Sequence, residues 1–444
     1  MSRLLQIIKR ALTGPSVIIL AAFLVRFAAM LIVHSHAPTP PMQYFKYGYE
    51  AGDVAASIAT GHGFSSPFGD STGPTAWFTP LYPYLLAGIF KIFGVYTFRS
   101  FLVALTLNCV FVAFTSLALY YIGREAFSRA VGIGAAWLWA FAPAGSQLAI
   151  SWVWDTCMAA MMVSLIFWAT LKMREAGSVR TWVGYGALWA LGILTNPAIL
   201  AVLPFLLFWL VFQDGARARE RLQSAAVAVL VIGLGITPWL VRNYAVFGTF
   251  VGLRSNLGLE LYLGNNEKAT DTWPFALHPS LNPAERAQYR QMGEIAYMKE
   301  KQRQAVHYML SSPGEAAHWT LRRFIENWTG ISDPLIDTWP HVNWGMRLVL
   351  IYHCTFPVLT FLGLFLASRN GRPAAFPLAA IILFYPIVYY FTHASLRYRY
   401  PIDPIMAVLA VYAVACGLSQ IAWRFQREGT AMSEHPTAKG YSEI

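Results

Sequence analysis

The stretch Thr181–Val211 reads TWVGYGALWALGILTNPAILAVLPFLLFWLV and contains no charged residue. As one helix its 31 residues would be about 46 Å long, too long for one membrane span and too short for two full ones. Basic residues flank it on both sides, and positive residues collect on the cytoplasmic side of a membrane. Both ends are therefore predicted to lie inside, with Asn196-Pro197 at the turn of a hairpin of two short helices.

The whole chain has the composition of a polytopic membrane protein. Of its 444 residues, 56% are hydrophobic and only 12% are charged, with a mean hydropathy of +0.45. A soluble domain has about twice that share of charged residues, so a soluble enzyme, a disordered protein and a nucleic-acid binder are excluded. The formal charge of +11 then reports topology rather than a polyanionic partner, because cytoplasmic loops collect Lys and Arg. The four cysteines show neither metal-ligand spacing nor a pairing pattern.

Apolar runs predict ten transmembrane helices with both termini in the cytoplasm. Besides the hairpin, eight runs are long enough, or nearly so, to cross a core of about 30 Å: 15–33, 100–122, 130–150, 156–171, 223–241, 348–367, 374–391 and 404–423. The predicted inner segments carry 16 Lys and Arg residues, whereas the long outer loop has ten basic and ten acidic residues. The orientation therefore follows the positive-inside rule. The predicted fold class is an all-α integral membrane protein, a polytopic bundle of about ten helices.

These spans divide the chain into four regions. They are an N-terminal transmembrane module, 1–241, which includes a first external loop, 35–99; a large external loop, 242–345; C-terminal transmembrane helices, 346–424; and a disordered cytoplasmic tail, 425–444. Within the first loop, Leu81–Phe93 is apolar but too short to span, which predicts a helix lying in the membrane interface. The second loop contains an amphipathic, charge-rich stretch near 284–308.

Three carboxylates are predicted at the outer membrane face. Glu50 and Asp53 follow the first span three residues apart, so on a helix they share a face. Asp155 lies at the outer end of the fourth span. Each also has a purely structural interpretation: Asp53 would cap or solvate an interfacial helix, and Asp155 would be the N-cap of the helix beginning at Thr156. No acidic residue falls in the middle of a predicted span, which disfavours an ion-coupled transporter.

Two arginines stand between the last two predicted spans. The segment HASLRYRYP, His393–Pro401, places Arg397 and Arg399 two residues apart with tyrosines interleaved. Arginine forms bidentate bonds with phosphate oxygens, which favours a lipid-phosphate clamp; the alternative is snorkelling arginines in an aromatic belt. Arg26, inside the first span, is expected to snorkel or to pair with an outer carboxylate. No cofactor is predicted and no metal site is assigned, since His62, His341 and His393 lack ligand spacing; the sequence leaves a divalent metal open.

The order of motifs in the first loop is similar to that of a known superfamily. An acidic helix start, then Gly61-His62-Gly63-Phe64, then PLYPYLL from Pro80 lead into an interfacial helix that ends at Phe93-Gly94. Together with RYRYPIDP from Arg397, this resembles the GT-C membrane glycosyltransferases, in particular the branch of the protein O-mannosyltransferases and the lipid A aminoarabinose transferase. The similarity runs through roughly the first 240 residues.

The resemblance implies an inverting glycosyltransferase. It would move a sugar from a polyprenyl-phosphate donor to an envelope acceptor on the outer, periplasmic face of the cytoplasmic membrane. It also implies Asp53 as general base, Glu50 as accessory acid, Asp155 as a residue that shapes the site, and Arg397 and Arg399 as holders of the donor phosphate. This division of labour is chemically sensible, since an inverting transfer needs a base beside the nucleophile and positive charge on the leaving phosphate.

One departure from the family concerns charge. Relatives acting on lipid A carry a Lys before a Pro-Pro pair, whereas this chain reads WFTPLYP from Trp77, so the missing charge would come from Lys46, Arg242 or Arg254. The alternative function is a polytopic lipid or glycolipid transporter, because the interrupted hairpin at Asn196-Pro197 is typical of helices that line binding sites.

Overall fold

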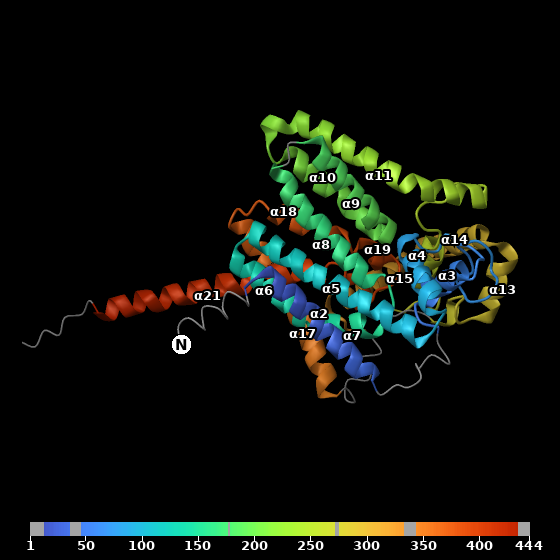
Figure 1. Ribbon diagram of the computed structural model, residues 1–444, viewed down its shortest axis with the longest axis horizontal. Coiled ribbons are helices and arrows are strands. Elements are labelled where there is room, and N and C mark those ends of the chain that lie inside the picture. Colours follow the sequence, from blue (N-terminus) through green and yellow to red (C-terminus); the bar gives the residue numbers. More distant parts are fainter. Residues whose placement is uncertain (1–12, 36–45, 176–177, 271–274, 333–342, 434–444) are drawn as a thin grey trace, which may run out of the picture.

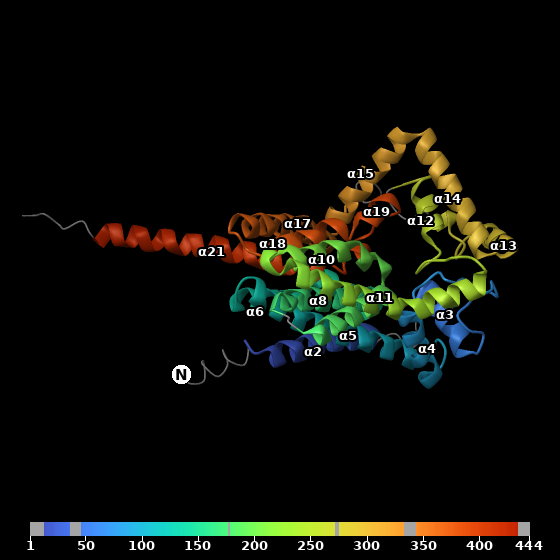
Figure 2. The same cartoon turned by 90° about the horizontal axis from the view of Figure 1, so that it is seen from above.

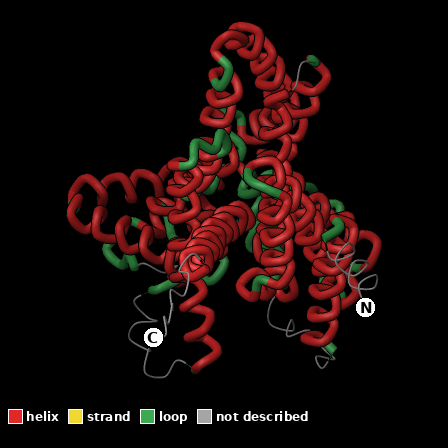
Figure 3. The backbone as a smooth tube through the Cα atoms, turned by 90° about the vertical axis from the view of Figure 1, so that its left-hand side faces the viewer, coloured by secondary structure: helices red, strands yellow, loops and turns green. Residues whose placement is uncertain are grey.

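The computed structural model describes residues 13–35, 46–175, 178–270, 275–332 and 343–433, and these residues are almost wholly helical (Figure 1, Figure 3). Within them, the β pairing is an isolated bridge between Ser65 and Pro74. The all-α prediction is confirmed.

Among the residues that the structure describes, six helical segments are long and apolar enough to cross a membrane: Pro15–His34 (α2), Phe98–Ala126 (α5), Thr156–Glu175 (α8, Thr156–Lys172, with the 3-10 turn η2, Met173–Glu175), Gly215–Phe247 (η4, Gly215–Arg217, with α11, Ala218–Phe247), Arg347–Arg369 (in α17, Trp344–Arg369) and Asp403–Gln420 (in α21, Asp403–Ser433). The chain is thus a multi-pass membrane protein. The other four predicted spans are present as shorter or interrupted helices: Arg129–Phe141 (α6) with Pro143–Ser151 (α7), Val179–Thr195 (α9), Pro197–Val202 (η3) with Leu203–Phe212 (α10), and Ala375–Phe384 (α18) with Ile387–Phe391 (α19). For these four, membrane crossing stays a prediction.

The hairpin predicted at Asn196-Pro197 has the expected geometry. Helix α9 ends at Thr195, and the Asn196 side chain caps η3 by accepting a hydrogen bond from the Ala198 N–H at 3.0 Å. Arg174, which precedes α9, donates to the Gln213 side chain at 3.0 Å after α10. The two ends of the segment therefore lie side by side, as a hairpin requires.

The interruption between α6 and α7 explains how Arg26 can be buried within the first predicted span. Proline has no N–H to bond the carbonyl four residues earlier, so Pro143 leaves the Trp139 carbonyl without its usual helical donor. The Arg26 guanidinium, fully buried in α2, donates to the carbonyls of Trp139 at 3.0 Å and Ala142 at 2.9 Å. The expectation that Arg26 snorkels or pairs with an outer carboxylate is therefore wrong, because the broken helix supplies better acceptors.

Close packing in the bundle depends on small residues. Helix α5 lies against α2, α6 and α8, α9 lies against α11, and α17 lies against α21. Where α5 meets α6, a Cβ on Gly123 would come within 2.5 Å of the Gly132 Cα. Glycine thus allows the two backbones to touch, as is common between membrane helices.

The two segments predicted to be external, called the outer segments below, gather at one end of the bundle (Figure 1, Figure 2). The first provides Tyr49–Ala59 (α3) and Leu81–Phe93 (α4); the second provides Leu257–Gly264 (α12), Phe275–Leu277 (η5), Pro283–Met292 (α13), Glu294–Ser311 (α14) and Pro313–Thr329 (α15). The short helix Leu396–Arg399 (α20) lies near α15. In Figure 2, α14 and α15 form an inverted V above α12. The predicted helix at 81–93 and the amphipathic stretch near 284–308 are thus both helical. Helix α21 continues to Ser433, into the segment predicted as a disordered tail, and 434–444 lie outside the described residues.

Candidate active site

Four of the five predicted site residues, all except Arg399, come from separate parts of the chain that meet near the outer segments. Helix α3 carries Glu50 and Asp53, Asp155 immediately precedes α8, and α20 carries Arg397. The second outer segment adds Arg254 and α12.

Asp53 is the most exposed of the three predicted carboxylates, although its side chain is still 86% covered. The Tyr96 hydroxyl donates to Oδ1 at 2.9 Å, and the Lys46 Nζ lies 3.4 Å from the same oxygen. Gly69, at φ +79°, passes so close that a Cβ there would lie 3.2 Å from Oδ2. Burial raises the pKa of Asp53, and the half-exposed Lys46 only partly opposes this. A raised pKa suits a carboxylate that accepts a proton.

Glu50 faces the second outer segment. The Ser280 hydroxyl donates to Oε1 at 2.6 Å, and the Nδ1 of the buried His278 lies 3.8 Å from the same oxygen. Burial raises the pKa of Glu50, with Ser280 and then Arg397 acting in the opposite direction. Burial also lowers the pKa of His278 to about 3, so this imidazole is neutral at physiological pH. Glu50 therefore joins the two outer segments.

Asp155 occupies the N-cap position of α8, but its side chain makes no capping hydrogen bond there. Its Oδ2 instead lies 3.3 Å from an Arg254 nitrogen and accepts from the Asn196 amide at 3.4 Å. Burial raises the pKa of Asp155, while Arg254 and then Arg397 lower it. The side chain is thus directed toward the cationic cluster instead of toward its own helix.

Arg397 is the cation shared by Glu50 and Asp155. Its guanidinium lies 4.4 Å from the Trp154 ring centroid and donates to the Tyr398 hydroxyl at 2.8 Å. It is close enough to Glu50 and Asp155 to act on the pKa of both groups. An aromatic base with a partly exposed guanidinium is compatible with binding a phosphate.

Arg399 lies apart from this cluster and is completely buried. Its Nε donates to Asp403 at 2.8 Å, and one terminal nitrogen donates to the carbonyls of Asn327 and Trp328, at 3.1 and 2.6 Å. The other terminal nitrogen lies 3.2 Å from the His353 Nδ1. Four of its five N–H groups are thus engaged within the protein, and the structure does not bring Arg399 to the other predicted residues.

Two further residues belong to the site. Arg254 was only one of three candidate cations in the sequence, and Glu260 was not predicted at all. Arg254, offered as one of three substitutes for a missing charge, pairs with Asp155 and lies 5.0 Å from the Phe78 ring centroid. Glu260 on α12 accepts from Asn256 at 2.8 Å and lies 3.3 Å from the His393 Nδ1. Burial and then Glu50 raise the pKa of Glu260 to about 7. Its only sequence signal is that it is the one acid in the apolar run LGLELYLG.

The other two candidate cations have different partners. Lys46 pairs with Asp53, whereas Arg242 donates to the backbone carbonyls of Thr75 at 2.6 Å and Phe64 at 2.8 Å. Glu294 on α14 holds the same loop: it accepts from the Thr75 hydroxyl at 2.5 Å and from the Ala76 N–H at 2.7 Å. The first loop is therefore shaped by residues distant in sequence.

Chemically, the cluster combines a partly accessible carboxylate with two guanidiniums near further carboxylates. No group of three or more His, Cys, Asp or Glu side chains arranged to hold a metal occurs among the residues the structure describes. The groups present can accept a proton and can neutralise an anionic leaving group.

The fold is similar to that of known membrane glycosyltransferases. The Archaeoglobus fulgidus oligosaccharyltransferase tethered with an acceptor peptide matches at a TM-score of 0.55 and 13% identity, over 95% of this chain and 52% of that chain. The same protein in complex with Zn and sulfate matches at 0.51 and 16%, over 91% and 50%. ArnT from Cupriavidus metallidurans, bound to undecaprenyl phosphate, matches at 0.41 and 15%, over 90% and 78%. The chain spans about half the length of the oligosaccharyltransferase, and the two stronger matches show a shared fold.

The helical architecture is thus similar to that of a membrane oligosaccharyltransferase. Residues 76–241, less than half of the chain, match the family model described as dolichyl-phosphate-mannose-protein mannosyltransferase, so the resemblance predicted from the sequence is confirmed. Of the predicted site residues, only Asp155 lies inside the matched region. No curated protein matches the chain in sequence.

Proposed function

We propose that this protein is an inverting glycosyltransferase that moves a sugar from a polyprenyl-phosphate donor to an envelope acceptor. The reaction would take place at the outer face of the cytoplasmic membrane, with both termini inside. The main support is the cluster in which Arg397 acts on both Glu50 and Asp155, beside the more accessible Asp53. The match to a lipid-phosphate-mannose transferase family adds to it.

In the proposed reaction, Asp53 accepts the proton of the acceptor hydroxyl as its oxygen attacks the anomeric carbon. The bond between that carbon and the phosphate oxygen breaks from the opposite side, which inverts the configuration and releases polyprenyl phosphate. Arg397 and Arg254 hold the phosphate charge that develops, an electrostatic role that often provides the largest part of catalysis. Asp155 orients Arg254 through their 3.3 Å contact. Arg399 is left out of this proposal because its hydrogen bonds are made within the protein.

The function is tested by mass spectrometry of envelope glycans, lipids and polyprenyl-phosphate sugars from cells that lack the protein. The cells are complemented with wild type, Asp53→Asn or Asp70→Asn at equal expression. Asp70 is the matched control, because it is a half-exposed carboxylate of the same loop that pairs with Arg286 and Arg290.

We expect one sugar mass to disappear from an acceptor while its polyprenyl-phosphate form accumulates, and only wild type and Asp70→Asn to restore it. Full restoration by Asp53→Asn would remove the proposed base. If the carrier-linked sugar instead stays on the inner face, the protein is the lipid or glycolipid transporter that the interrupted hairpin also suggests.

A further inference from the structure

A second polar site lies at the opposite end of the bundle from the carboxylates. It is a cavity of about 420 Å³ lined by the turn between α5 and α6, the end of α17, the turn that follows it, and α21. This volume falls within the range of small-molecule sites. Candidate membrane spans end beside it at Ala126 and Arg369, so the cavity lies at the level of one membrane surface. On the proposed topology, this surface is cytoplasmic.

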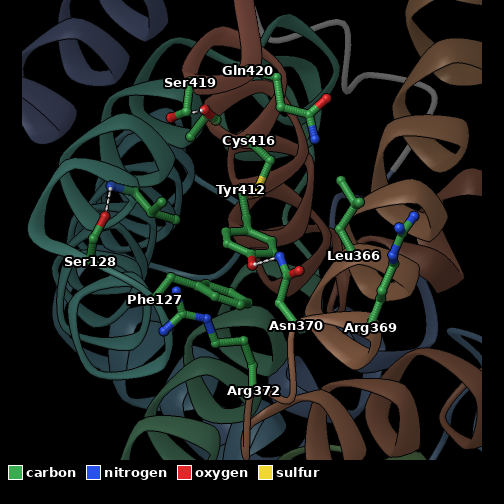
Figure 4. Close-up of a pocket in the computed structure, with 12 residues that line it drawn as sticks. Phe127, Ser128, Leu366, Arg369, Asn370, Arg372, Tyr412, Cys416, Ser419 and Gln420 are labelled. Atoms are coloured by element: carbon green, nitrogen blue, oxygen red, sulfur yellow. Dashed lines mark hydrogen bonds between the residues drawn. The ribbon is translucent and has the colours of Figure 1, made fainter. Parts of the chain in front are cut away.

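The floor of the cavity is aromatic and well ordered by its contacts. Phe127 and Tyr412 stack with ring centroids 3.9 Å apart and planes 15° apart. The Asn370 amide donates to the Tyr412 hydroxyl at 2.9 Å, a bond drawn near the middle of Figure 4. Because this hydroxyl accepts from Asn370, its own proton remains available for a ligand oxygen. Tyr412 is 4% exposed, so its side chain is held by the residues packed around it.

Two arginines lie at the rim. Arg369 and Arg372 are exposed, and among the residues the structure describes neither side chain has an ion-pair or hydrogen-bond partner. Gly371, at φ +61°, turns the chain between them, and the Arg372 N–H bonds back to the Ala367 carbonyl at 2.9 Å. The backbone thus places both arginines on the same cavity, where Figure 4 shows them on either side of Asn370. No carboxylate is among the described residues that line it.

The surface next to the cavity is apolar and suited to contact with lipid acyl chains. The helices that line the cavity expose large apolar side chains beside the lining residues: Phe365 on α17 is 59% exposed and Leu418 on α21 is 62% exposed. Acyl chains can lie on this surface while a headgroup occupies the cavity. A soluble anion would use the arginines but not the apolar surface next to them.

We propose that this cavity binds the headgroup of an anionic glycerophospholipid. The phosphate lies between Arg369 and Arg372 and accepts the free proton of Tyr412, and the acyl chains extend along α17 and α21. This site is separate from the proposed donor site and takes no part in sugar transfer.

The test uses the full-length protein in nanodiscs made of equal amounts of phosphatidylglycerol and phosphatidylethanolamine. Lipids retained after detergent extraction are counted by native mass spectrometry for wild type and for the double variant Arg369→Gln, Arg372→Gln. The matched control is Arg180→Gln, Arg219→Gln, which removes two exposed arginines that the proposed topology also places on the cytoplasmic side. Tyr412→Phe removes the buried donor without changing the charge.

We expect wild type to retain phosphatidylglycerol selectively and the Arg369, Arg372 double variant to bind it roughly thirtyfold more weakly. Tyr412→Phe should weaken it by roughly fivefold, and the control double variant by less than roughly threefold. Equal losses in the two double variants would mean only a diffuse surface charge. Equal retention of the two lipids, or displacement of the lipid by excess inorganic phosphate, would overturn the proposal. Size-exclusion profiles identify any variant that fails to fold, and Tyr412→Phe then decides.

Discussion

The two outer segments contribute different functional groups to the same cluster. The first, from Lys46 to Thr97, provides the carboxylates of Glu50 and Asp53 on one helix. The second, from Arg254 to Thr329, provides a cation, a further acid on α12, and Ser280, which bonds Glu50. The first could be interpreted from sequence because its acids are three residues apart on a short helix. From the second, only Arg254 was named, as one of three candidate cations, because Glu260 and Ser280 lie far along the chain from the Glu50 that they meet.

The substitution with the largest expected effect tests whether the first outer segment provides the general base. Asp53→Asn should lower the rate of sugar transfer by about 10²–10⁴, because a general base contributes that much. The measurement is turnover by purified protein in liposomes, with Asp70→Asn as the control. An unchanged rate would leave the first segment with a structural role only.

The second prediction distinguishes the roles of two neighbouring arginines, Arg397 and Arg399. Arg397→Gln should lower the rate by about 10²–10³, as removal of a transition-state donor does, without lowering the melting temperature. Arg399→Gln should destabilise the fold by about 3–5 kcal/mol, because it leaves Asp403 buried without its charged partner. Kinetics and thermal unfolding in detergent distinguish the two. If Arg397→Gln unfolds the protein while Arg399→Gln remains stable but inactive, their proposed roles are reversed.

A third prediction concerns the acid of the second segment. The pKa of Glu260 is raised from 4.5 to about 7, so the fold favours its protonated form. The contribution of this protonation to the free energy of unfolding is fully present below about pH 4.5. It is lost as the pH rises through 7, by at most about 3 kcal/mol. Glu260→Gln, which resembles the protonated acid, should flatten the fall in melting temperature between pH 5 and 8. An unchanged pH profile would show that Glu260 ionises freely.

The substitution with the smallest expected effect tests whether the second outer segment holds the loop of the first in place. Glu294→Gln weakens the bonds that hold Thr75 and Ala76, at a cost of about 1–3 kcal/mol. Hydrogen exchange should therefore accelerate between Phe64 and Thr79, while α5 exchanges as in wild type. Glu300→Gln on the same helix, where Glu300 pairs with the exposed Arg303, is the control. Equal exchange in both variants would mean that Arg242 alone holds the loop.

The sequence was sufficient for the membrane class and for the hairpin. Hydrophobic run length determines whether a segment can span, and the Asn196-Pro197 break forces a turn wherever the chain lies. The interruptions within the predicted spans 130–150 and 374–391 were not predicted, because they leave the apolar composition unchanged. Only the structure shows that Arg26 compensates for the first of these breaks.

By itself, the sequence determined the all-helical membrane fold, the family resemblance and the placement of Glu50 and Asp53 three residues apart on one helix, since all three depend on residue type and short spacing. The tertiary structure alone decided which charges meet. Arg397 and Arg399 are two residues apart on one short helix, yet one faces the carboxylates and the other is buried against Asp403 and the end of α15. Their spacing is the same whichever one is exposed, because the environment of a charge is set by the helices packed around it.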